Sequence, residues 1–280
     1  MSQIAKSSNL SVVLITRDHS DFILECLESI QREFSQTVPV FIVDVGSKDE
    51  TLSIIEDFTE ENFLTAKVIS TKRELTPLDA FRVLIGHIET DYISVISGDD
   101  FFLNGYGALV NQISTERSGN VLVQFAHAVV DHQSKKIGER VPRWTSNPKL
   151  DRKKILYSNP GATAGSLLPW KILVEKCLDD KDFNTMIEDY YFSCKLISSV
   201  TFKTVKDEVV AYRHHPNNLM KNTSQVEYVL SLGICVRLAW NIAKNPIEKL
   251  TTLFLFFRWG RKVPMTCLPA MIRGFFKQTI

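Results

Sequence analysis

The alternation of strand-like and helix-like segments in the first hundred residues constrains the fold of this chain more than any other feature. Short runs rich in Val and Ile, typical of buried strands, alternate there with amphipathic patterns typical of helices. Strands joined by helices pair in parallel, so this alternation predicts an α/β fold built on a parallel sheet. The expected strands cover residues 11–16, 40–45, 66–70 and 92–96, and the expected helices cover 21–34, 49–58 and 77–88.

The next part of the chain is less regular. Residues 121–130 have the pattern of a strand, and residues 131–148 are polar, carry four Lys or Arg residues and are expected to form a loop. A long loop beside a functional site is often a lid or a wall of that site. Further expected elements are helices over 149–157, 169–178 and 185–198, and one or two strands over 202–212.

The last sixty residues differ in character from the rest. Residues 226–243 form an apolar helical run, residues 253–259 are rich in Phe, and the tail mixes apolar with basic side chains. No run reaches the roughly 18 to 20 uncharged residues that a bilayer span needs. These helices either lie in the interface of a membrane or cover the main domain or a dimer partner, and both interpretations stay open. We therefore expect a main domain over 1–220 and a helical extension over 221–280.

The composition fits one main domain with an appendage. The chain has 280 residues, 44% of them hydrophobic, and can bury a full core. Its 33 Lys and Arg against 32 Asp and Glu give a net charge of +1, so the overall electrostatic field does not favour the binding of nucleic acid. A role in binding RNA or DNA is therefore not expected.

The cysteines and the amino-terminal sequence indicate the cellular compartment in which the protein is expected. The five cysteines lie among apolar neighbours without the paired spacing of zinc or redox sites, and we expect them to be reduced core residues. The first residues contain no apolar stretch long enough for a signal peptide. The expected location is the cytoplasm, including the cytoplasmic membrane face if the C-terminal helices bind lipid.

The clearest chemical signal is the sequence Ser97-Gly98-Asp99-Asp100, which directly follows the apolar run 92–96. Two carboxylates at the carboxyl end of a strand would lie in the crevice where open α/β sheets bind ligands. Their oxygen atoms suit Mg²⁺ or Mn²⁺, and such an ion could carry a diphosphate. The alternative is an Asp-rich turn whose side chains bond their own backbone.

Several motifs together resemble the family 2 glycosyltransferases, which are inverting enzymes with the GT-A fold. Residues 12–17 and 22–30 look like the first strand of that family and its helix of YLxECLxSI type. Residues 42–51, IVDVGSKDET, are similar to the family signature VVDDGSxDGT, with Val45 at the position of its second Asp. The resemblance covers about residues 10–220 and implies a single, mostly parallel twisted sheet flanked by helices, with a C-terminal helical extension.

This resemblance implies that one end of the site binds a nucleotide-sugar donor, with a UDP-sugar favoured. The Asp99-Asp100 pair matches the Asp-x-Asp region of the family, with Ser97 in place of its first acid. Asp99 is then the expected ligand of Mn²⁺ or Mg²⁺, an ion that neutralises the leaving diphosphate, and Asp100 assists. Asp44, at the end of the second strand, is expected to accept hydrogen bonds from the base or ribose.

The same resemblance also implies which residues act on the acceptor. Glu188 and Asp189 match an ED motif that opens a helix, and Asp189 is the expected general base. Glu188 orients the acceptor or only occupies the first helical turn, where acids suit the helix dipole. Residues 211–218 are similar to the closing YRxHxxNxS stretch, so His215 is a metal ligand or a diphosphate contact, or otherwise a surface residue of a turn. The residues expected to bind substrate are Thr16, Asp18, Asp44, Ser97, Asp100, Glu188 and Arg213.

The sequence thus predicts a metal-dependent, inverting glycosyltransferase that moves a sugar from a nucleotide diphosphate to a hydroxyl of a glycan or polyprenyl-linked acceptor, as in the synthesis of O antigen or capsule. A non-catalytic relative is one alternative: it would keep the fold as a binding or scaffolding subunit, with Val45 and Ser97 recording the loss of donor chemistry. A sugar nucleotidylyltransferase is another, but residues 16–20 lack the glycines of its phosphate loop. The sequence leaves the oligomeric state open.

Overall fold

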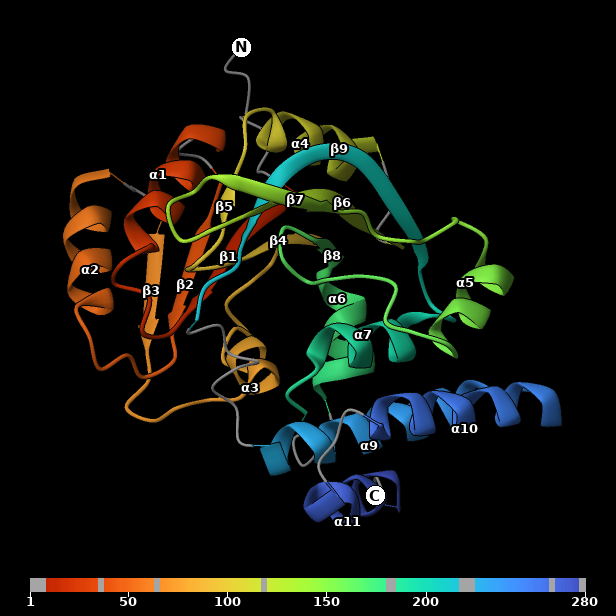
Figure 1. The fold of residues 1–280 in the computed structure, drawn as a ribbon. Coiled ribbons are helices and arrows are strands. Elements are labelled where there is room, and N and C mark those ends of the chain that lie inside the picture. Colours follow the sequence, from red (N-terminus) through yellow and green to blue (C-terminus); the bar gives the residue numbers. More distant parts are fainter. Residues whose placement is uncertain are drawn as a thin grey trace.

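The structure is a computed structural model that describes residues 9–34, 38–62, 66–116, 120–179, 185–216, 225–261 and 265–276. A curved sheet lies at its centre (Figure 1). Its strands are β1 (Leu10–Thr16), β2 (Val40–Asp44), β3 (Ala66–Ser70), β4 (Tyr92–Ser97), β5 (Phe101–Phe102), β6 (Val121–Val130), β7 (Lys136–Arg140), β8 (Leu167–Pro169) and β9 (Thr201–Arg213). They pair in the order β3-β2-β1-β4-β8-β6-β9-β5, and β7 pairs with β6.

The first half of the sheet confirms the parallel arrangement predicted from the sequence. Strands β3, β2, β1 and β4 pair in parallel, and the burial of β1 on both faces explains its nearly continuous apolar run. Helices α1 (Ile23–Glu33), α2 (Thr51–Asn62) and α3 (Pro77–Arg82) connect these strands. Helix α3 begins at its cap Thr76, as the following proline predicts, but it ends six residues before the predicted 88. The chain continues there in tighter turns, in which the Leu84 and Ile85 amides donate to carbonyl oxygens three residues back.

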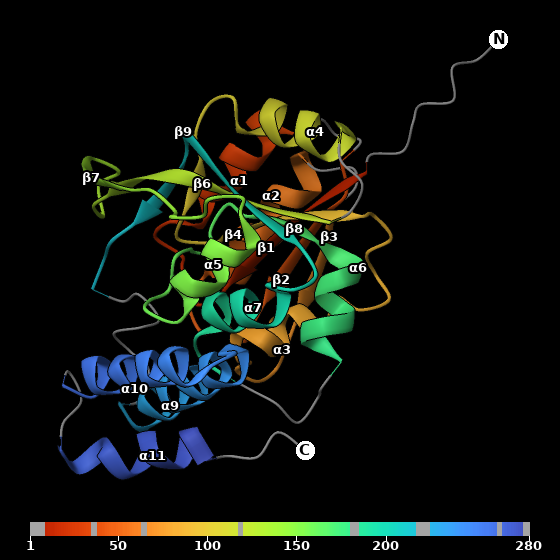
Figure 2. The same cartoon turned by 90° about the vertical axis from the view of Figure 1, so that its right-hand side faces the viewer.

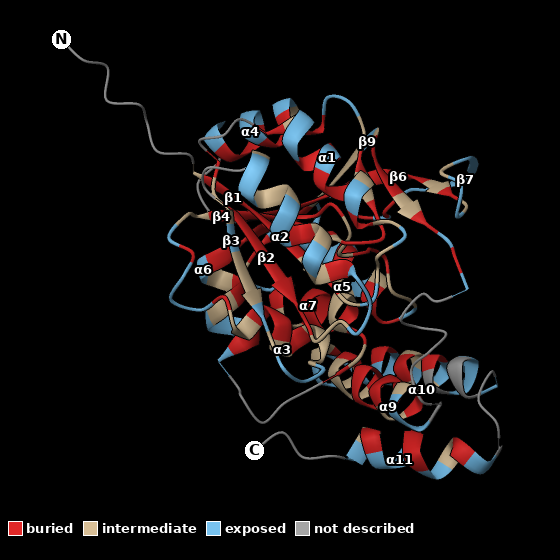
Figure 3. Cartoon of the chain, turned by 90° about the vertical axis from the view of Figure 1, so that its left-hand side faces the viewer, coloured by how far each residue is buried: buried red, intermediate tan, exposed pale blue. Residues whose placement is uncertain are grey.

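Helices cover both faces of the sheet, and each face has its own core. Along β1, Val12 and Leu14 belong to the core beneath α1, α2 and α4 (Tyr106–Glu116), whereas Val13 belongs to the core of the opposite face. This alternation follows from the two-residue period of a strand. The opposite face is covered by α3, α6 (Trp170–Leu173) and α7 (Glu188–Leu196), and Figure 3 shows β2 between the two layers as a buried strand.

The second half of the sheet is mixed. Strand β8 pairs antiparallel with β4 and β6, and β6 pairs in parallel with β9, which is one long strand with two register shifts. The segment 131–148, predicted as a loop, contains β7, which forms a hairpin with β6. The side chains of β7 are exposed, so it lacks the apolar face that reveals a strand in a sequence. The predicted helix over 169–178 begins instead as the end of β8 and continues as α6 and a π-helical turn, Val174–Leu178.

The C-terminal extension is helical, as predicted, although the boundary expected at residue 220 lies outside the described residues. It contains α9 (Gln225–Ile242), α10 (Pro246–Gly260) and α11 (Leu268–Phe276), which lie together below the sheet domain (Figure 2). Helix α9 contributes Val229, Leu232 and Val236 to the core that it shares with α7. Within the described residues, no helix is both long enough and apolar enough to span a bilayer.

Two glycines allow α9 and α11 to approach closely. A Cβ on Gly233 would lie 2.0 Å from the Met271 carbonyl oxygen, and one on Gly274 would lie 2.2 Å from the Leu230 carbonyl oxygen. We expect Gly233→Ala to destabilise the docking of α11 by roughly 1 to 3 kcal/mol, because backbone must move to admit the methyl group. Hydrogen exchange of the α11 amides measures this loss.

The matched control is Gly138→Ala in β7, where the nearest atom to the added methyl group is Val129 Cβ at 3.9 Å. This variant should leave the exchange of α11 unchanged. If the α11 amides exchange as slowly in Gly233→Ala as in the unmodified protein, the two helices do not pack in this way.

Candidate active site

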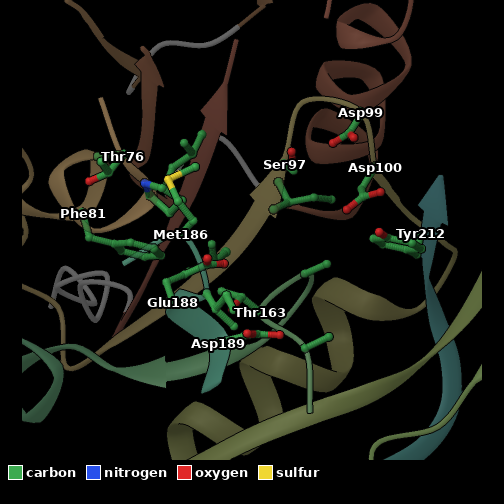
Figure 4. A pocket seen from close by; sticks show the side chains of 18 of the residues that line it. Thr76, Phe81, Ser97, Asp99, Asp100, Thr163, Met186, Glu188, Asp189 and Tyr212 are labelled. Carbon is green, nitrogen blue, oxygen red and sulfur yellow. The ribbon is translucent and has the colours of Figure 1, made fainter. Parts of the chain in front are cut away.

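A cavity of about 640 Å³ lies at the carboxyl ends of β1 and β4. Figure 4 shows Asp99 and Asp100 at one end of it and Glu188 and Asp189 toward the other. Six of the ten site residues expected from the sequence line this cavity. They are Thr16, Ser97, Asp99, Asp100, Glu188 and Asp189. Two acidic motifs that are far apart in the sequence therefore share one cavity.

The Asp99 end of the cavity forms where β1 and β4 end together. Ile15 pairs with Ser97, and the Gly98 amide donates to the Ile15 carbonyl at 3.1 Å, which continues the pairing one residue past β4. A Cβ at Gly98 would lie only 2.2 Å from Thr16 Oγ1. Glycine is required at this position because the chain that carries the carboxylates passes directly against β1.

Asp99 forms a cluster with two histidines. Its Oδ2 lies 3.0 Å from His215 Nε2 and 3.9 Å from His19 Nε2. Burial favours the neutral form of Asp99, but the hydrogen bond with His215 and the nearby His19 outweigh burial and lower its pKa to about 2. Asp99 is therefore a carboxylate at neutral pH.

His19 is a member of this cluster that the sequence did not predict. It lies in the polar turn after β1, where Thr16 Oγ1 is 3.1 Å from its Nδ1 and fixes the ring. Burial lowers the pKa of His19, which favours the neutral imidazole that binds metals. Nothing in the local sequence distinguishes this histidine from a surface residue.

The three side chains fit a divalent metal ion. One carboxylate oxygen and two imidazole nitrogens lie within 4.8 Å of one another. Ligand atoms about 2.1 Å from one ion lie roughly 3 to 4 Å apart, which matches the two distances measured from Asp99. Asp99, His215 and His19 could therefore meet at one ion with small movements of their side chains.

Arg213 supports this end of the cavity but does not line it. Its side chain is 1% exposed, its Nε donates to the Asp99 carbonyl at 2.8 Å, and its amide donates to Asp100 Oδ1 at 2.8 Å. The guanidinium also pairs with Glu25 and lies 4.7 Å from the ring centre of Phe22. Burial and the Asp99 charge raise the pKa of Asp100. The geometry gives Arg213 a role in holding the two carboxylates in place, whereas the sequence predicts contact with substrate.

Three other expected residues, His215, Asp44 and Asp18, also lie outside the cavity lining. The carboxylate of Asp44 accepts hydrogen bonds from the amide and hydroxyl of Ser47 and from Ser70 Oγ at 3.2 Å. Asp18 has a φ of 52° and accepts a hydrogen bond from the Lys48 amide at 2.7 Å. These bonds tie together the turns that follow β1 and β2. Contact of either carboxylate with a nucleotide stays a prediction.

The start of α7 forms another part of the cavity, which we call the Asp189 end. Glu188 and Asp189 are its first two residues, and Asn159 Nδ2 donates to Asp189 Oδ2 at 2.7 Å. Burial raises the pKa of both carboxyl groups, and the charge of Asp189 helps to raise that of Glu188 to about 8. Glu188 therefore keeps its proton at neutral pH, and the hydrogen bond from Asn159 opposes the effect of burial on the pKa of Asp189, which favours the carboxylate form that can accept a proton.

The raised pKa of Glu188 predicts a pH-dependent stability. The folded protein keeps a proton that the unfolded chain releases near its ordinary pKa of 4.5, so this contribution is complete below 4.5 and is lost as the pH rises to about 8. Glu188→Gln should remove it. The difference in unfolding free energy between the two proteins should change by up to about 1.4 kcal/mol per pH unit across that interval.

Urea denaturation at several pH values between 4.5 and 8 measures this difference. The other titrating groups are common to both proteins and cancel in the comparison, except Asp189, whose titration depends on that of Glu188. Parallel stability curves for the two proteins would show that Glu188 titrates at its ordinary pKa.

Several residues of the cavity were not predicted from the sequence. Asn159 lies in the loop before β8, and Arg140, Arg143 and Arg258 also line the cavity, each donating a hydrogen bond to a carbonyl oxygen of that loop. Two of these arginines belong to the basic segment 131–148, which the sequence predicts as a wall or lid of the site. Arg258 comes from α10, and no local pattern connects that helix with the two acidic motifs.

The sequence and the structure were compared with known proteins. A family model described as glycosyl transferase family 2 matches residues 11–168, whereas no curated protein matches the chain. The structure is similar to S. aureus TarS residues 1–349 in complex with UDP-GlcNAc, with a TM-score of 0.67, 17% identity, and coverage of 95% of this chain and 79% of that chain. It is also similar to the mannosyltransferase PcManGT from Pyrobaculum calidifontis in complex with GDP-Man and Mn²⁺, with a TM-score of 0.59, 11% identity, and coverage of 97% and 80%.

Proposed function

The chain belongs to glycosyl transferase family 2 and has the GT-A fold, and from this premise we propose that it transfers a sugar from a nucleotide diphosphate to a hydroxyl of a glycan or polyprenyl-linked acceptor, with inversion. The observation that carries this proposal is the shared cavity, which both Asp99 and Asp189 line. A UDP-sugar is the favoured donor because TarS, with a similar fold, is in complex with UDP-GlcNAc. GDP-Man, found in the complex of PcManGT, is the second choice.

The Asp99 end of the cavity would hold the donor. Asp99, His215 and His19 would bind Mn²⁺ or Mg²⁺, and the two imidazole ligands favour Mn²⁺. Such an ion, when bound, neutralises charge on the leaving diphosphate. Thr16 and Ser97 line the cavity beside this cluster and would contact the donor.

The Asp189 end would carry out the proton transfer. Asp189 accepts the proton of the acceptor hydroxyl while the hydroxyl oxygen attacks the anomeric carbon from the face opposite the diphosphate. The hydrogen bond from Asn159 fixes the orientation of this carboxylate. Glu188 is protonated at neutral pH, so it does not compete for the proton and can donate a hydrogen bond to a bound sugar.

Release of nucleoside diphosphate tests this function before the acceptor is known. Purified protein with Mn²⁺ is incubated for hours with UDP-N-acetylglucosamine, UDP-glucose and GDP-mannose, with water as the acceptor. One donor should be cleaved faster than in a protein-free control, and Asp189→Asn should lose that excess rate. If none of the donors is cleaved above the control rate, the scaffolding alternative becomes the better account.

We also propose that the C-terminal extension binds an anionic membrane surface, where a polyprenyl-linked acceptor would be found. Four apolar residues follow one face of α10 at helical spacing and are 66 to 78% exposed. They are Ile247, Leu250, Phe254 and Phe257. Residues 246–280 contain six Lys or Arg and a single acid, Glu248, which is paired with Arg152. An exposed apolar stripe with basic flanks suits anionic lipid.

Sedimentation with lipid vesicles tests this docking. The double variant Phe254→Ser and Phe257→Ser should bind vesicles of mixed anionic and neutral lipid at least about tenfold more weakly, because two phenyl groups no longer leave water. Ile137→Ser, which changes an exposed apolar residue on β7, is the control. Equal binding by all three proteins would remove the support for a membrane site on α10.

The compartment follows from the same proposal. All five cysteines are buried, as the sequence predicted, and buried thiols of this kind are usual in proteins of the reducing cytoplasm. We therefore place the protein in the cytoplasm, on the inner face of the cytoplasmic membrane, in the assembly of a surface polysaccharide.

A further inference from the structure

Three arginines gather at the Asp189 end of the cavity, and the proposed reaction leaves them without a role. Arg140 ends β7, Arg143 lies in the segment before α5 (Pro148–Ile155), and Arg258 lies near the end of α10. All three line the cavity, and all three are exposed to solvent. Separate parts of the fold therefore bring guanidinium groups to the same end of one cavity.

One stretch of backbone, residues 157–161, anchors all three side chains. Carbonyl oxygens at alternate positions of this stretch each accept a hydrogen bond from one guanidinium. These bonds run from Arg258 Nη1 to Tyr157 at 3.4 Å, from Arg143 Nη2 to Asn159 at 3.3 Å and from Arg140 Nη2 to Gly161 at 3.1 Å. The Asn159 side chain from the same stretch holds Asp189. The arginines are thus tied to the loop that positions the general base.

Four arginines line the cavity. Arg17 pairs with Glu74, whereas Arg140, Arg143 and Arg258 have no carboxylate partner among the described residues. Like charges held at one end of a cavity repel one another, and a bound anion would relieve that repulsion. Each guanidinium has five N–H donors, of which the backbone anchors use one or two, so donors remain for a ligand.

Arg140 also lies within electrostatic reach of the proposed general base, Asp189. Burial raises the pKa of Asp189, and the charge of Arg140 acts in the opposite direction. An anion bound by this group would therefore lie close to the carboxylate that removes the hydroxyl proton. The paired N–H groups of arginine suit the oxygen atoms of a phosphate group, which can accept two parallel hydrogen bonds.

We infer that Arg140, Arg143 and Arg258 bind a phosphate group of the acceptor, next to the hydroxyl that receives the sugar. This inference rests on the proposed function and adds the chemical class of the acceptor. The phosphate belongs either to the diphosphate of a lipid carrier or to a phosphodiester in a polyol chain, since both present the same oxygen atoms. The diphosphate of the donor binds at the other end of the cavity.

Calorimetric binding of phosphate probes to the full chain tests the inference. The buffer contains EDTA and no nucleotide, so the result does not depend on the donor end. Farnesyl diphosphate represents the lipid carrier and glycerophosphoglycerol the polyol phosphodiester, and farnesol and glycerol are their uncharged counterparts. The double variant Arg140→Ala and Arg143→Ala is compared with Lys135→Ala and Lys136→Ala, which removes the same charge from the same hairpin outside the cavity lining.

We expect the unmodified protein and the lysine variant to bind one phosphate probe and neither alcohol, and the arginine variant to bind that probe at least tenfold more weakly. Tighter binding of farnesyl diphosphate identifies a lipid carrier, and tighter binding of the phosphodiester identifies a polyol chain. Equal binding by the arginine variant, or no binding of either phosphate probe, would overturn the inference. Failure of metal-dependent nucleotide binding would contradict the proposed function but leave this result unaffected.

Discussion

Asp189→Asn is expected to slow sugar transfer about a thousandfold, because an amide cannot take the proton of the acceptor hydroxyl. Asn keeps the size of the side chain and an oxygen that can accept the hydrogen bond from Asn159. The loss should therefore appear in the catalytic rate and not in donor binding. The measurement is the rate of nucleoside diphosphate release, together with the thermal shift that the nucleotide and Mn²⁺ produce in each protein.

Glu188→Gln provides the matched control, because it makes the same chemical change in the neighbouring residue of α7. Glutamine resembles the protonated Glu188 that the raised pKa implies at neutral pH, so this variant should keep activity within about tenfold. If Glu188→Gln is inactive and Asp189→Asn is active, the two carboxyl groups have exchanged roles. Full activity in both variants would mean that neither residue is the base.

Asp99→Ala is expected to weaken the binding of Mn²⁺ at least about a hundredfold, since it removes the carboxylate that lies closest to both histidines. Electron paramagnetic resonance of free Mn²⁺ measures the affinity without any enzyme assay. His19→Ala should weaken binding by about tenfold or more, because this imidazole is the third ligand of the cluster. Metal-dependent nucleotide binding should decline in the same order.

Asp57→Ala on α2 is the control for this series, since it removes an exposed carboxylate far from the cavity lining. It should bind Mn²⁺ as the unmodified protein does. Unchanged Mn²⁺ affinity in Asp99→Ala would show that the ion binds elsewhere. Unchanged affinity in His19→Ala alone would reduce the site to Asp99 and His215.

The parallel half of the sheet was predictable because its strands are buried on both faces and form continuous apolar runs. The same logic located Asp99 and Asp100, which follow the end of β4, since parallel strands present their carboxyl ends at one edge. Glu188 and Asp189 were found by resemblance to a motif. Only the fold shows that both pairs line one cavity.

Other features of the site and the fold depend on contacts between distant segments, which no local sequence pattern predicts. His19 is a ligand candidate only because β1 ends beside Asp99, and Arg258 reaches the cavity only because the helical extension folds back over it. Strand β7 was missed because an exposed strand has no apolar face. Arg213 was expected in contact with substrate from its motif, but its burial behind Asp99 is a property of packing.

Thermal unfolding of the purified protein with UDP, GDP, TDP and CMP, each with and without Mn²⁺, tests the donor site most directly. A ligand that binds only the folded state raises the apparent stability. We predict that one nucleoside diphosphate, with UDP the first candidate, raises the unfolding temperature only when Mn²⁺ is present, and that Asp99→Ala abolishes the shift. No shift with any nucleotide, or a shift with CMP alone, would contradict a metal-dependent nucleotide diphosphate site.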